Sequence, residues 1–326
     1  MALLFMDGFG GEDILFKWDP NSQGISTASA SPRVPGCFYG NTNYSSIYKT
    51  FTASSKIIIG LGYSPNDNAL ITFSGDGGTI RHITVVRDNT TGRLQIRRGD
   101  YNGTLLATGT QQLFAGMWNY VEVSVTISDT VGEVHVRLNG SLTDDVLYIG
   151  DTKNGGTAST IDKVTINTAG GRLADVYILD GTGPVNNDFL GDVVVRTLSP
   201  SGNGNSSQLV GSDGNSTDNY LLVDEHPYSA SDYVGSATVG QKDTYAMADL
   251  PAGVTTVYGV QINSMMMKSD ASLAQSRLLL RSAGTDYAGI TRALTTSSIG
   301  YYELYSQDPA TSAAWTPAGV NGIESG

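Results

Sequence analysis

A regular alternation of apolar and polar residues runs from Trp118 to Leu142. Valine or isoleucine occupies every second position of 121–127, and valine and leucine repeat this spacing in 134–138. Because successive side chains of a strand point to opposite faces, each segment has one apolar face and one polar face. The intervening loop, 128–132, ends in glycine, as many hairpin loops do. We therefore predict an antiparallel hairpin at the centre of a β-sandwich.

Further short strands are expected on both sides of this hairpin. Segment 56–63, KIIIGLGY, is continuously apolar, which is typical of a central strand buried on both faces. In 80–87 and 93–98 the side chains alternate between two faces instead. Turn clusters that separate strands at roughly 8–12-residue spacing indicate an all-β sandwich or barrel. The other strands expected in this part are 2–6, 44–52, 69–74, 101–108, 111–114, 161–167 and 172–179.

A run of turn-forming residues at 180–187 predicts a boundary between two domains. A chain of 326 residues is long for one core, because single cores stop growing near ~250–300 residues. We place a β-sandwich at 1–182 and a second, smaller β domain at 183–326. Within the second domain, the Ser-, Gly- and Asn-rich segment 199–219 is expected to be a loop, either mobile or held by a partner, since it offers little apolar surface. Residues 310–326 are expected to form a loose tail.

The charge and the apolar runs exclude several classes of partner. The net charge is −12 and the pI is near 4.5. Phosphate binding needs clustered Lys and Arg, so neither nucleic acid nor an anionic membrane is expected as a partner. No apolar run approaches the ~20 residues of a membrane-spanning helix. The start, MALLFMDGF, lacks the basic residues of a signal peptide, so we expect a protein made in a cytoplasm, without membrane insertion. Cys37 stands alone and is interpreted as a buried structural thiol.

The sequence offers no recognisable catalytic set. Its three histidines, His82, His135 and His226, are scattered and make no zinc spacing, and no GxSxG elbow occurs. Glycoside hydrolysis needs two carboxylates that face a sugar across a cleft. Glu122 and Glu133 lie on the polar faces of the central hairpin as isolated carboxylates. No catalytic residue is therefore assigned, and an enzyme is not expected.

Three aspartates in or beside turns are candidates for a carbohydrate or cation site. Asp76 lies in the turn 74–78, and Asp144 and Asp145 follow the central hairpin. Carboxylate oxygens in turns suit Ca²⁺, although aspartate is also an ordinary turn residue, and this simpler interpretation stays open. The 17 tyrosines invite a carbohydrate interpretation as well, since aromatic faces stack on sugar rings, but many of them are needed to pack the sheets.

Several segments resemble a known family. WNYVEVSVTISDTVGEVHVRLNG is similar to the paired strands W-x-x-[VI]-E-V-x-[VI] and G-x-[VI]-x-[VI]-x-[VL]-[ND]-G of concanavalin A-like, laminin G-like jelly rolls. The opening MALLFMDGF, the segment RLADVYILDGTGPVNNDFLGDVVVRTLSPSG and the closing WTPAGVNGIESG resemble one group within them, the virion structural proteins of tailed bacteriophages. The resemblance implies a two-sheet jelly roll on the virion surface, in a tail, a fibre or a capsid decoration. Its implied partners are other virion proteins and copies of this chain.

The resemblance carries no catalytic residues, and the chain lacks the E-x-D-x-x-E strand of the glycosidases that share this fold. Three hypotheses follow. The first is a non-enzymatic virion structural protein that contributes to host attachment. The second is a carbohydrate-binding adhesin or lectin that recognises a host surface glycan, either alone or with the help of calcium at 74–78. The third and least favoured is a polysaccharide-degrading enzyme. The first two are compatible, because a virion protein can be the one that binds the host.

Overall fold

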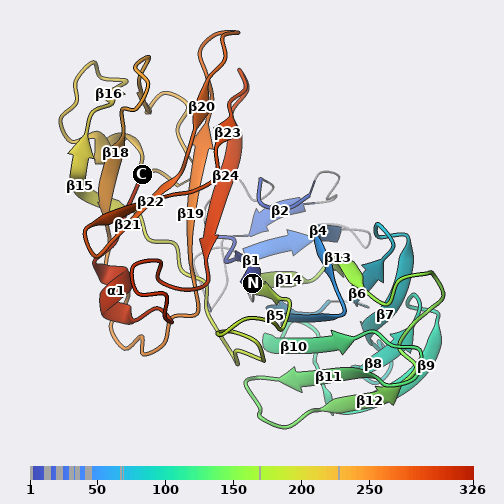
Figure 1. The fold of residues 1–326 in the computed structure, drawn as a ribbon. Coiled ribbons are helices and arrows are strands. Elements are labelled where there is room, and N and C mark those ends of the chain that lie inside the picture. The colour runs from blue at the N-terminus through green and yellow to red at the C-terminus, as the bar shows by residue number, and fades with distance from the viewer. Residues whose placement is uncertain are drawn as a thin grey trace. The chain divides into compact units, whose positions relative to one another are not determined.

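We describe a computed structural model of the chain, covering residues 3–10, 16–19, 25–28, 33, 37–40, 46–66, 68, 70–168, 170–226 and 228–326. The fold is nearly all β, as predicted (Figure 1). The chain divides into two compact units, which are described separately. The first unit includes residues up to Arg196 and the second begins at Thr197, apart from a short early segment, 11–17, that belongs to the second unit. The expected boundary at 182/183 thus lies inside the first unit.

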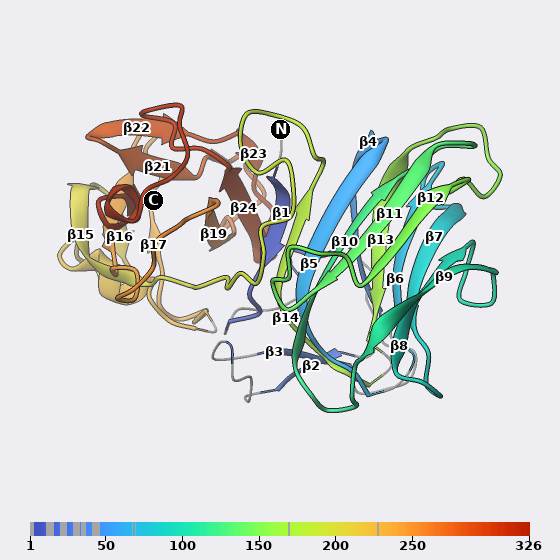
Figure 2. The same ribbon diagram turned by 90° about the horizontal axis from the view of Figure 1, so that it is seen from below.

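The first unit is a sandwich of two antiparallel sheets, whose strands are seen together in Figure 2. Within the described residues, sheet A has the order β12-β11-β10-β5-β14-β3-β2, and β1 also pairs with β14. Its strands are β1 (Leu3–Asp7), β2 (Ile25–Ala28), β3 (Cys37–Gly40), β5 (Lys56–Ser64), β10 (Asn119–Thr126), β11 (Gly132–Leu138), β12 (Val146–Gly150) and β14 (Arg172–Leu179).

Sheet B is the second layer, and in the described part of the chain it has the order β4-β13-β6-β7-β8-β9. Its strands are β4 (Ser46–Ser54), β6 (Leu70–Gly75), β7 (Ile80–Arg87), β8 (Arg93–Arg98), β9 (Thr104–Gln112) and β13 (Ile161–Asn167). β13 lies between β4 and β6, although both neighbours come far earlier in the sequence. The sheet is therefore completed by a strand that follows the central hairpin.

The predicted central hairpin is confirmed. In β10 and β11, Val123 lies opposite Val136 and Val125 lies opposite Val134, and all four side chains are fully buried. β5 pairs with β10 on one side and β14 on the other, which explains why its sequence is apolar throughout. Cys37 is fully buried, as expected for a structural thiol.

A segment that we call the strap, residues 188–196, lies on the outer face of sheet A. Glu122 of β10 is 1% exposed, and its Oε1 accepts hydrogen bonds from Tyr177 Oη at 2.6 Å and from Gly191 N at 2.8 Å. Asp175 is fully buried and accepts from Val195 N at 2.9 Å and from Arg33 Nε at 2.8 Å. These anchors place the residues after 182 in the first unit.

Two glycines of β5 make room for the side chains beneath the strap. A Cβ at Gly60 would collide with the ring of Tyr177, and a Cβ at Gly62 would touch the side chain of Arg33 at 2.9 Å. The guanidinium of Arg33 in turn lies 4.9 Å from the ring centroid of Tyr120. The outer face of β5 is therefore buried by two large side chains that only glycine admits.

In the second unit, the described residues form one larger sheet and three two-stranded ribbons. A buried cluster around Leu280 and Trp315 forms its core, with Ile262, Leu278, Val320 and Ile323. The sheet has the order β15-β18-β25-β21-β22 and the ribbons are β16-β17, β19-β24 and β20-β23. The elements are β15 (Pro200–Ser207), β16 (Val210–Gly211), a 3-10 helix (Asn219–Leu222), β17 (Val234–Gly235), β18 (Asp243–Met247), β19 (Val260–Met266), β20 (Gln275–Ser276), β21 (Leu279–Ser282), β22 (Thr285–Ala288), β23 (Arg292–Ala293), β24 (Ile299–Tyr305), α1 (Pro317–Asn321) and β25 (Glu324–Ser325).

Two expectations for this unit were wrong. Segment 200–207 was expected to be a loop, yet it is strand β15, because β18 pairs with it and Asp243 accepts hydrogen bonds from the amides of Gln208 and Leu209. The tail after residue 310 is ordered, because Trp315 is 4% exposed in the core and β25 lies between β18 and β21. Neither segment has an apolar period that would have revealed it.

Candidate ligand-binding face

A row of side chains crosses the outer face of sheet B, with one residue from each strand. Cross-strand partners lie on the same face of a sheet, and the pairing connects neighbours directly from β4 to β9. The residues that alternate with them, such as Ile83 and Val164, are fully buried between the sheets. The row therefore faces outward. We call it the threonine row, and its members are Tyr48, Thr165, Thr72, Thr84, Arg97 and Leu105.

The hydroxyl groups at the centre of the threonine row are held in place. Thr84 Oγ1 donates to the carbonyl of Gly99 at 2.6 Å, and it lies 3.3 Å from Thr72 Oγ1. Because Thr84 already uses its proton, the proton between the two hydroxyls comes from Thr72. Threonine is also stiff at χ1 because its Cβ is branched. The row thus presents polar groups whose orientation is largely fixed before any ligand arrives.

Arg97 is fixed as well, and its partners are neutral. Its Nη2 and Nε donate to Gln95 Oε1 at 2.7 and 3.2 Å, and its Nη1 donates to the carbonyl of Gly103 at 3.1 Å. None of these acceptors is ionised, so these hydrogen bonds do not offset the positive charge of the guanidinium. Near the other end of the row, Lys163 Nζ lies 3.8 Å from the ring centroid of Tyr48, a cation–π contact.

The row has the dimensions of an extended ligand. Neighbouring strands lie about 4.8 Å apart, so the four spacings from Tyr48 on β4 to Arg97 on β8 cover about 19 Å. Tyr48, Thr165, Thr72 and Arg97 are half-buried, and Leu105 is 48% exposed at the β9 edge. Thr84 is fully buried, so its hydroxyl fixes Thr72 and does not itself reach a ligand. This geometry can align polar contacts along a chain-like molecule that crosses the strands.

The expected site residue Asp76 serves a turn. Its Oδ2 accepts from Thr157 N at 3.2 Å, and its backbone has a left-handed φ of 53°. In the same turn, the amides of Gly77 and Gly78 donate to the carboxylate of Asp162 at 2.7 and 3.0 Å. These bonds tie the β6–β7 turn to the neighbouring segments, which is the simpler interpretation that the sequence left open for Asp76.

Asp144 and Asp145 hold the turn between β11 and β12. Asp144 accepts from His135 Nδ1 at 2.8 Å and from Arg137 Nε at 3.0 Å. Burial opposes ionisation, but these hydrogen bonds outweigh it and lower the pKa of Asp144. Asp145 Oδ1 accepts from the amides of Thr110 and Gln111 at 3.1 and 2.8 Å, so it connects this turn to β9. Among the described residues, no three His, Cys, Asp or Glu side chains gather as metal ligands would.

The buried carboxylates of sheet A do not form an open acid pair. Burial raises the pKa values of Glu122 and Asp175. Shifts of this direction are common at catalytic acids. Here, however, the strap covers both groups, since Gly191 N binds Glu122 and Val195 N binds Asp175. We therefore assign them to the anchoring of the strap.

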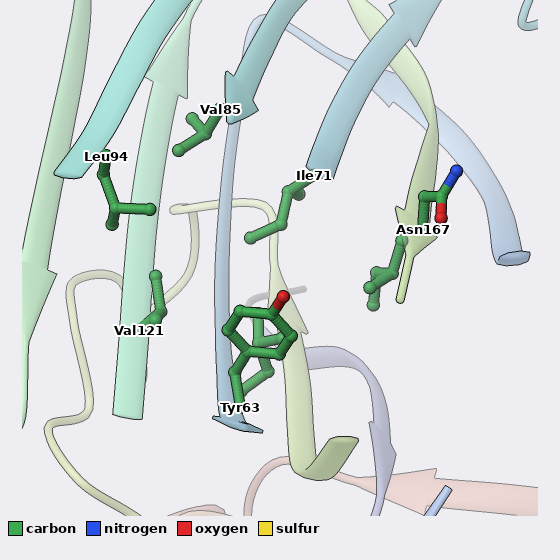
Figure 3. Close-up of a pocket in the computed structure, with 8 residues that line it drawn as sticks. Tyr63, Ile71, Val85, Leu94, Val121 and Asn167 are labelled. Carbon is green, nitrogen blue, oxygen red and sulfur yellow. The ribbon is translucent and has the colours of Figure 1, made fainter. Parts of the chain in front are cut away.

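Two other features are also structural. His82 is fully buried, its Nδ1 accepts from Asn154 N at 3.2 Å, and burial lowers its pKa. A small apolar cavity lies between the sheets, with about 20 Å³ of free space, and Figure 3 shows residues that line it, including Leu94 and Val121. This space is about enough for one water molecule.

No helix in the described part of the chain is long and apolar enough to span a membrane.

The sequence contained part of the signal for the threonine row. The alternation in 80–87 and 93–98 placed Thr84, Arg97 and Gln95 on strand faces, but it did not indicate which strands lie beside them. Thr165 and Tyr48 join the row only because β13 pairs with both β4 and β6. That pairing is non-local, so the row became visible only in the structure.

No family model matches the chain, and no curated protein matches it by sequence. Among solved structures, it is similar to a protein of unknown function with a galectin-like fold from Bacillus subtilis, at 13% identity over 55% of this chain and 96% of the other, with a TM-score of 0.39. It is also similar to a carbohydrate-binding module from Bacillus subtilis, at 10% identity over 48% and 93% of the chains, with a TM-score of 0.30. A galectin from Caenorhabditis elegans matches at 11% identity over 40% and 88%, with a TM-score of 0.28. These similarities are too weak to carry a function.

Proposed function

We propose that this protein binds carbohydrate on the outer face of sheet B, along the threonine row. The observation that carries the proposal is the row itself, in which fixed hydroxyls lie between the aromatic ring of Tyr48 and the guanidinium of Arg97. A sugar presents hydroxyls that donate and accept hydrogen bonds, and its C–H faces pack on aromatic rings. Threonine, glutamine and arginine side chains supply the complementary groups, and tyrosine supplies the apolar surface.

Binding fits this face better than cleavage. Glycoside hydrolysis requires an acid and a second carboxylate placed about 5–9.5 Å apart around the scissile bond. The threonine row contains no carboxylate, and the strap occupies the buried carboxylates Glu122 and Asp175. The proposed role is therefore that of a lectin-like binding protein. Among the described residues, the threonine row offers the polysaccharide-degrading alternative no carboxylate.

The place of the protein on a virion stays a prediction that rests on the sequence resemblance alone. Other virion proteins and copies of this chain as partners also stay predictions from that resemblance. Calcium stays a prediction from the aspartates in turns, and the origin in a host cytoplasm stays a prediction from the lack of a signal peptide. A carbohydrate-binding face is compatible with that prediction, because a virion protein that contributes to attachment needs a surface for the host glycan.

A glycan array probed with the full chain tests the proposal. We expect binding to a defined set of glycans, and we expect the double variant Thr72→Val/Thr165→Val to lose at least tenfold in affinity. Valine has nearly the shape of threonine, so this change removes hydroxyls and leaves the packing of the sheet intact. Thr217→Val is the matched control, because Thr217 is exposed in the second unit and should change nothing. Unchanged affinity in the double variant, or no glycan bound at all, would overturn the proposed function.

A further inference from the structure

We propose that the ligand of this face is an acidic polysaccharide, whose carboxylate or sulfate groups are received by Arg97 and Lys163. This inference rests on the proposed function and adds the chemical class of the saccharide. It starts from an unusual distribution of charge, because a chain with 31 acidic and 19 basic residues places cations without acidic partners on one face.

The cations of this face differ from most others in the first unit. Arg93, Arg97 and Lys163 lie on strands β8 and β13, and in the described part of the chain none of them has a carboxylate within 4.0 Å, the limit for an ion pair. Other cations of the unit do have such partners: Arg33, Lys49, Arg81, Arg98, Arg137 and Lys153. Within the described residues, Arg97 of the threonine row and its neighbours Arg93 and Lys163 therefore carry positive charge that no ion pair offsets.

The nearest acidic groups are engaged elsewhere. Asp88 acts on Arg97 only from beyond ion-pair distance, and its carboxylate accepts from Thr91 Oγ1 at 2.7 Å and Thr90 N at 3.2 Å. Asp162, next to Lys163 in the chain, accepts from the two glycine amides of the β6–β7 turn. Both carboxylates accept hydrogen bonds in turns at the rim of the sheet. The positive charges of Arg97 and Lys163 therefore remain available for a ligand.

Arg97 is prepared to receive an anion. A guanidinium has five N–H donors, and the three bonds to Gln95 and Gly103 leave about two of them. Those bonds fix the planar group, which reduces the entropy lost on binding. Arginine pairs with carboxylate and sulfate-like oxyanions through parallel N–H donors, a geometry that lysine does not provide. Arg97 would therefore orient the anion, and Lys163 would add charge at the other end.

A polysaccharide fits this charge better than a nucleic acid. Tight binding to nucleic acid uses about 6–10 phosphate contacts in well-studied cases. The face offers three cations, in a chain whose net charge of −12 repels a dense polyanion. A saccharide with widely spaced acidic groups needs fewer cations, and its hydroxyls match Thr72 and Thr165. The combination of fixed hydroxyls with sparse cations is what such a ligand requires.

The experiment measures binding of the full chain to polygalacturonate, dextran sulfate, unmodified dextran and oligo(dT) by biolayer interferometry at 50 and 300 mM salt. We expect one of the two acidic polysaccharides to bind at least tenfold more tightly than dextran, and more weakly at the higher salt. The carboxylated and the sulfated polymer distinguish the two sources of the anion. Arg97→Gln/Lys163→Gln should lose at least tenfold in this affinity. Arg277→Gln/Lys268→Gln is the matched control, since it removes the same charge from the second unit, at the exposed Arg277 and the half-buried Lys268.

Each contrary result has a separate meaning. If neutral glycans bind and depend on Thr72 and Thr165 but not on Arg97 and Lys163, the inference fails and the proposed function stands. If no saccharide binds, both fail. Tighter binding of oligo(dT) than of either acidic polysaccharide would also overturn the inference, in favour of a nucleic-acid ligand. A loss equal to that of the control variant would assign the effect to overall charge and not to this face.

Discussion

We expect the hydroxyl of Tyr177 to make the main hydrogen-bonded anchor of the strap on sheet A, and Tyr177→Phe tests this directly. The hydroxyl donates to Glu122 Oε1 at 2.6 Å and accepts from Leu190 N at 3.2 Å, so it joins β14, β10 and the strap at one atom. Phenylalanine keeps the ring that lies against Gly60 and removes only the oxygen. The variant therefore isolates two hydrogen bonds with little change in packing.

The expected cost follows from those two bonds. A hydrogen bond to a charged group contributes about 1.5–3 kcal/mol, and a neutral one contributes about 0.5–1.5 kcal/mol. Glu122 is 1% exposed, so water cannot replace the lost donor without opening the strap. We expect the free energy for local opening of the strap to fall by about 2–4 kcal/mol. If the strap of the parent protein opens at a smaller free energy than this, the variant should lose all of its protection.

Hydrogen exchange measured residue by residue is the suitable assay, because a chain with two units need not unfold in one step. Protection of the Leu190 and Gly191 amides should fall at least tenfold, since about 1.4 kcal/mol corresponds to a factor of ten. Val195 N is bound by Asp175 and should change less. Tyr148→Phe is the control, because its hydroxyl makes one 3.4 Å bond, to Asp151 O. If the strap amides are equally protected in both variants, the Tyr177 hydroxyl is not the main anchor of the strap.

Two further predictions concern the same region. Gly60→Ala places a methyl group in the ring of Tyr177 and should destabilise the first unit by about 1–3 kcal/mol in urea unfolding. The same substitution should cost much less when it is made in a Tyr177→Ala background, and an equal cost in both backgrounds would mean that the backbone, and not the ring, sets it. Burial raises the pKa of Glu122, so the folded state holds this proton to higher pH than the unfolded state does. The stability that the protonated carboxyl contributes is therefore present at low pH and is lost as the pH rises through the folded pKa. Above pH 4.5, the free energy of unfolding should fall less steeply in Glu122→Gln than in the parent, by at most about 1.4 kcal/mol per pH unit, and the remaining fall includes the similar effect of Asp175. Identical pH profiles for the variant and the parent would contradict this.

The sequence predicted those parts of the fold that depend on local patterns. The hairpin β10–β11 was found because both strands alternate β-branched and polar residues across a short loop, so that pairing needs no distant partner. The continuous apolar run of β5 likewise indicated a central strand. Its two glycines were understood only with the structure, since the residues that cover them, Arg33 and Tyr177, are far apart in the chain.

Strand β15 shows why other elements could not be predicted. Its sequence, PSGNGNSS, has no apolar residue that would indicate a buried face. It becomes a strand because β18 pairs with it, and because Glu324 at the far end of the chain accepts a hydrogen bond from Asn205 N at 2.7 Å. Such long-range hydrogen bonds leave no period in the sequence.

The candidate site residues also separate into those with a local sequence signal and those without one. The expected site residues Asp76, Asp144 and Asp145 were chosen because carboxylates in turns suit cations. In the structure, Asp76 and Asp145 accept from backbone amides of neighbouring segments, and Asp144 accepts from the side chains of His135 and Arg137. The threonine row carries no such local signature, because a single threonine on a strand is ordinary. Only the order of the strands brings Thr72, Thr84 and Thr165 into line.

A β-sandwich has two outer faces, and in the first unit the strap covers part of the outer face of sheet A but not that of sheet B. On sheet A, Gly60 and Gly62 admit Tyr177 and Arg33, and the buried carboxylates Glu122 and Asp175 then bind the amides of the strap. A face that uses its polar groups on its own chain has few left for a ligand. On sheet B, the polar groups bind one another and their own turns, as Arg97 does with Gln95 and Gly103. They are fixed without being covered by the strap, and this difference between the two faces is why we propose the threonine row, and not sheet A, as the ligand-binding face.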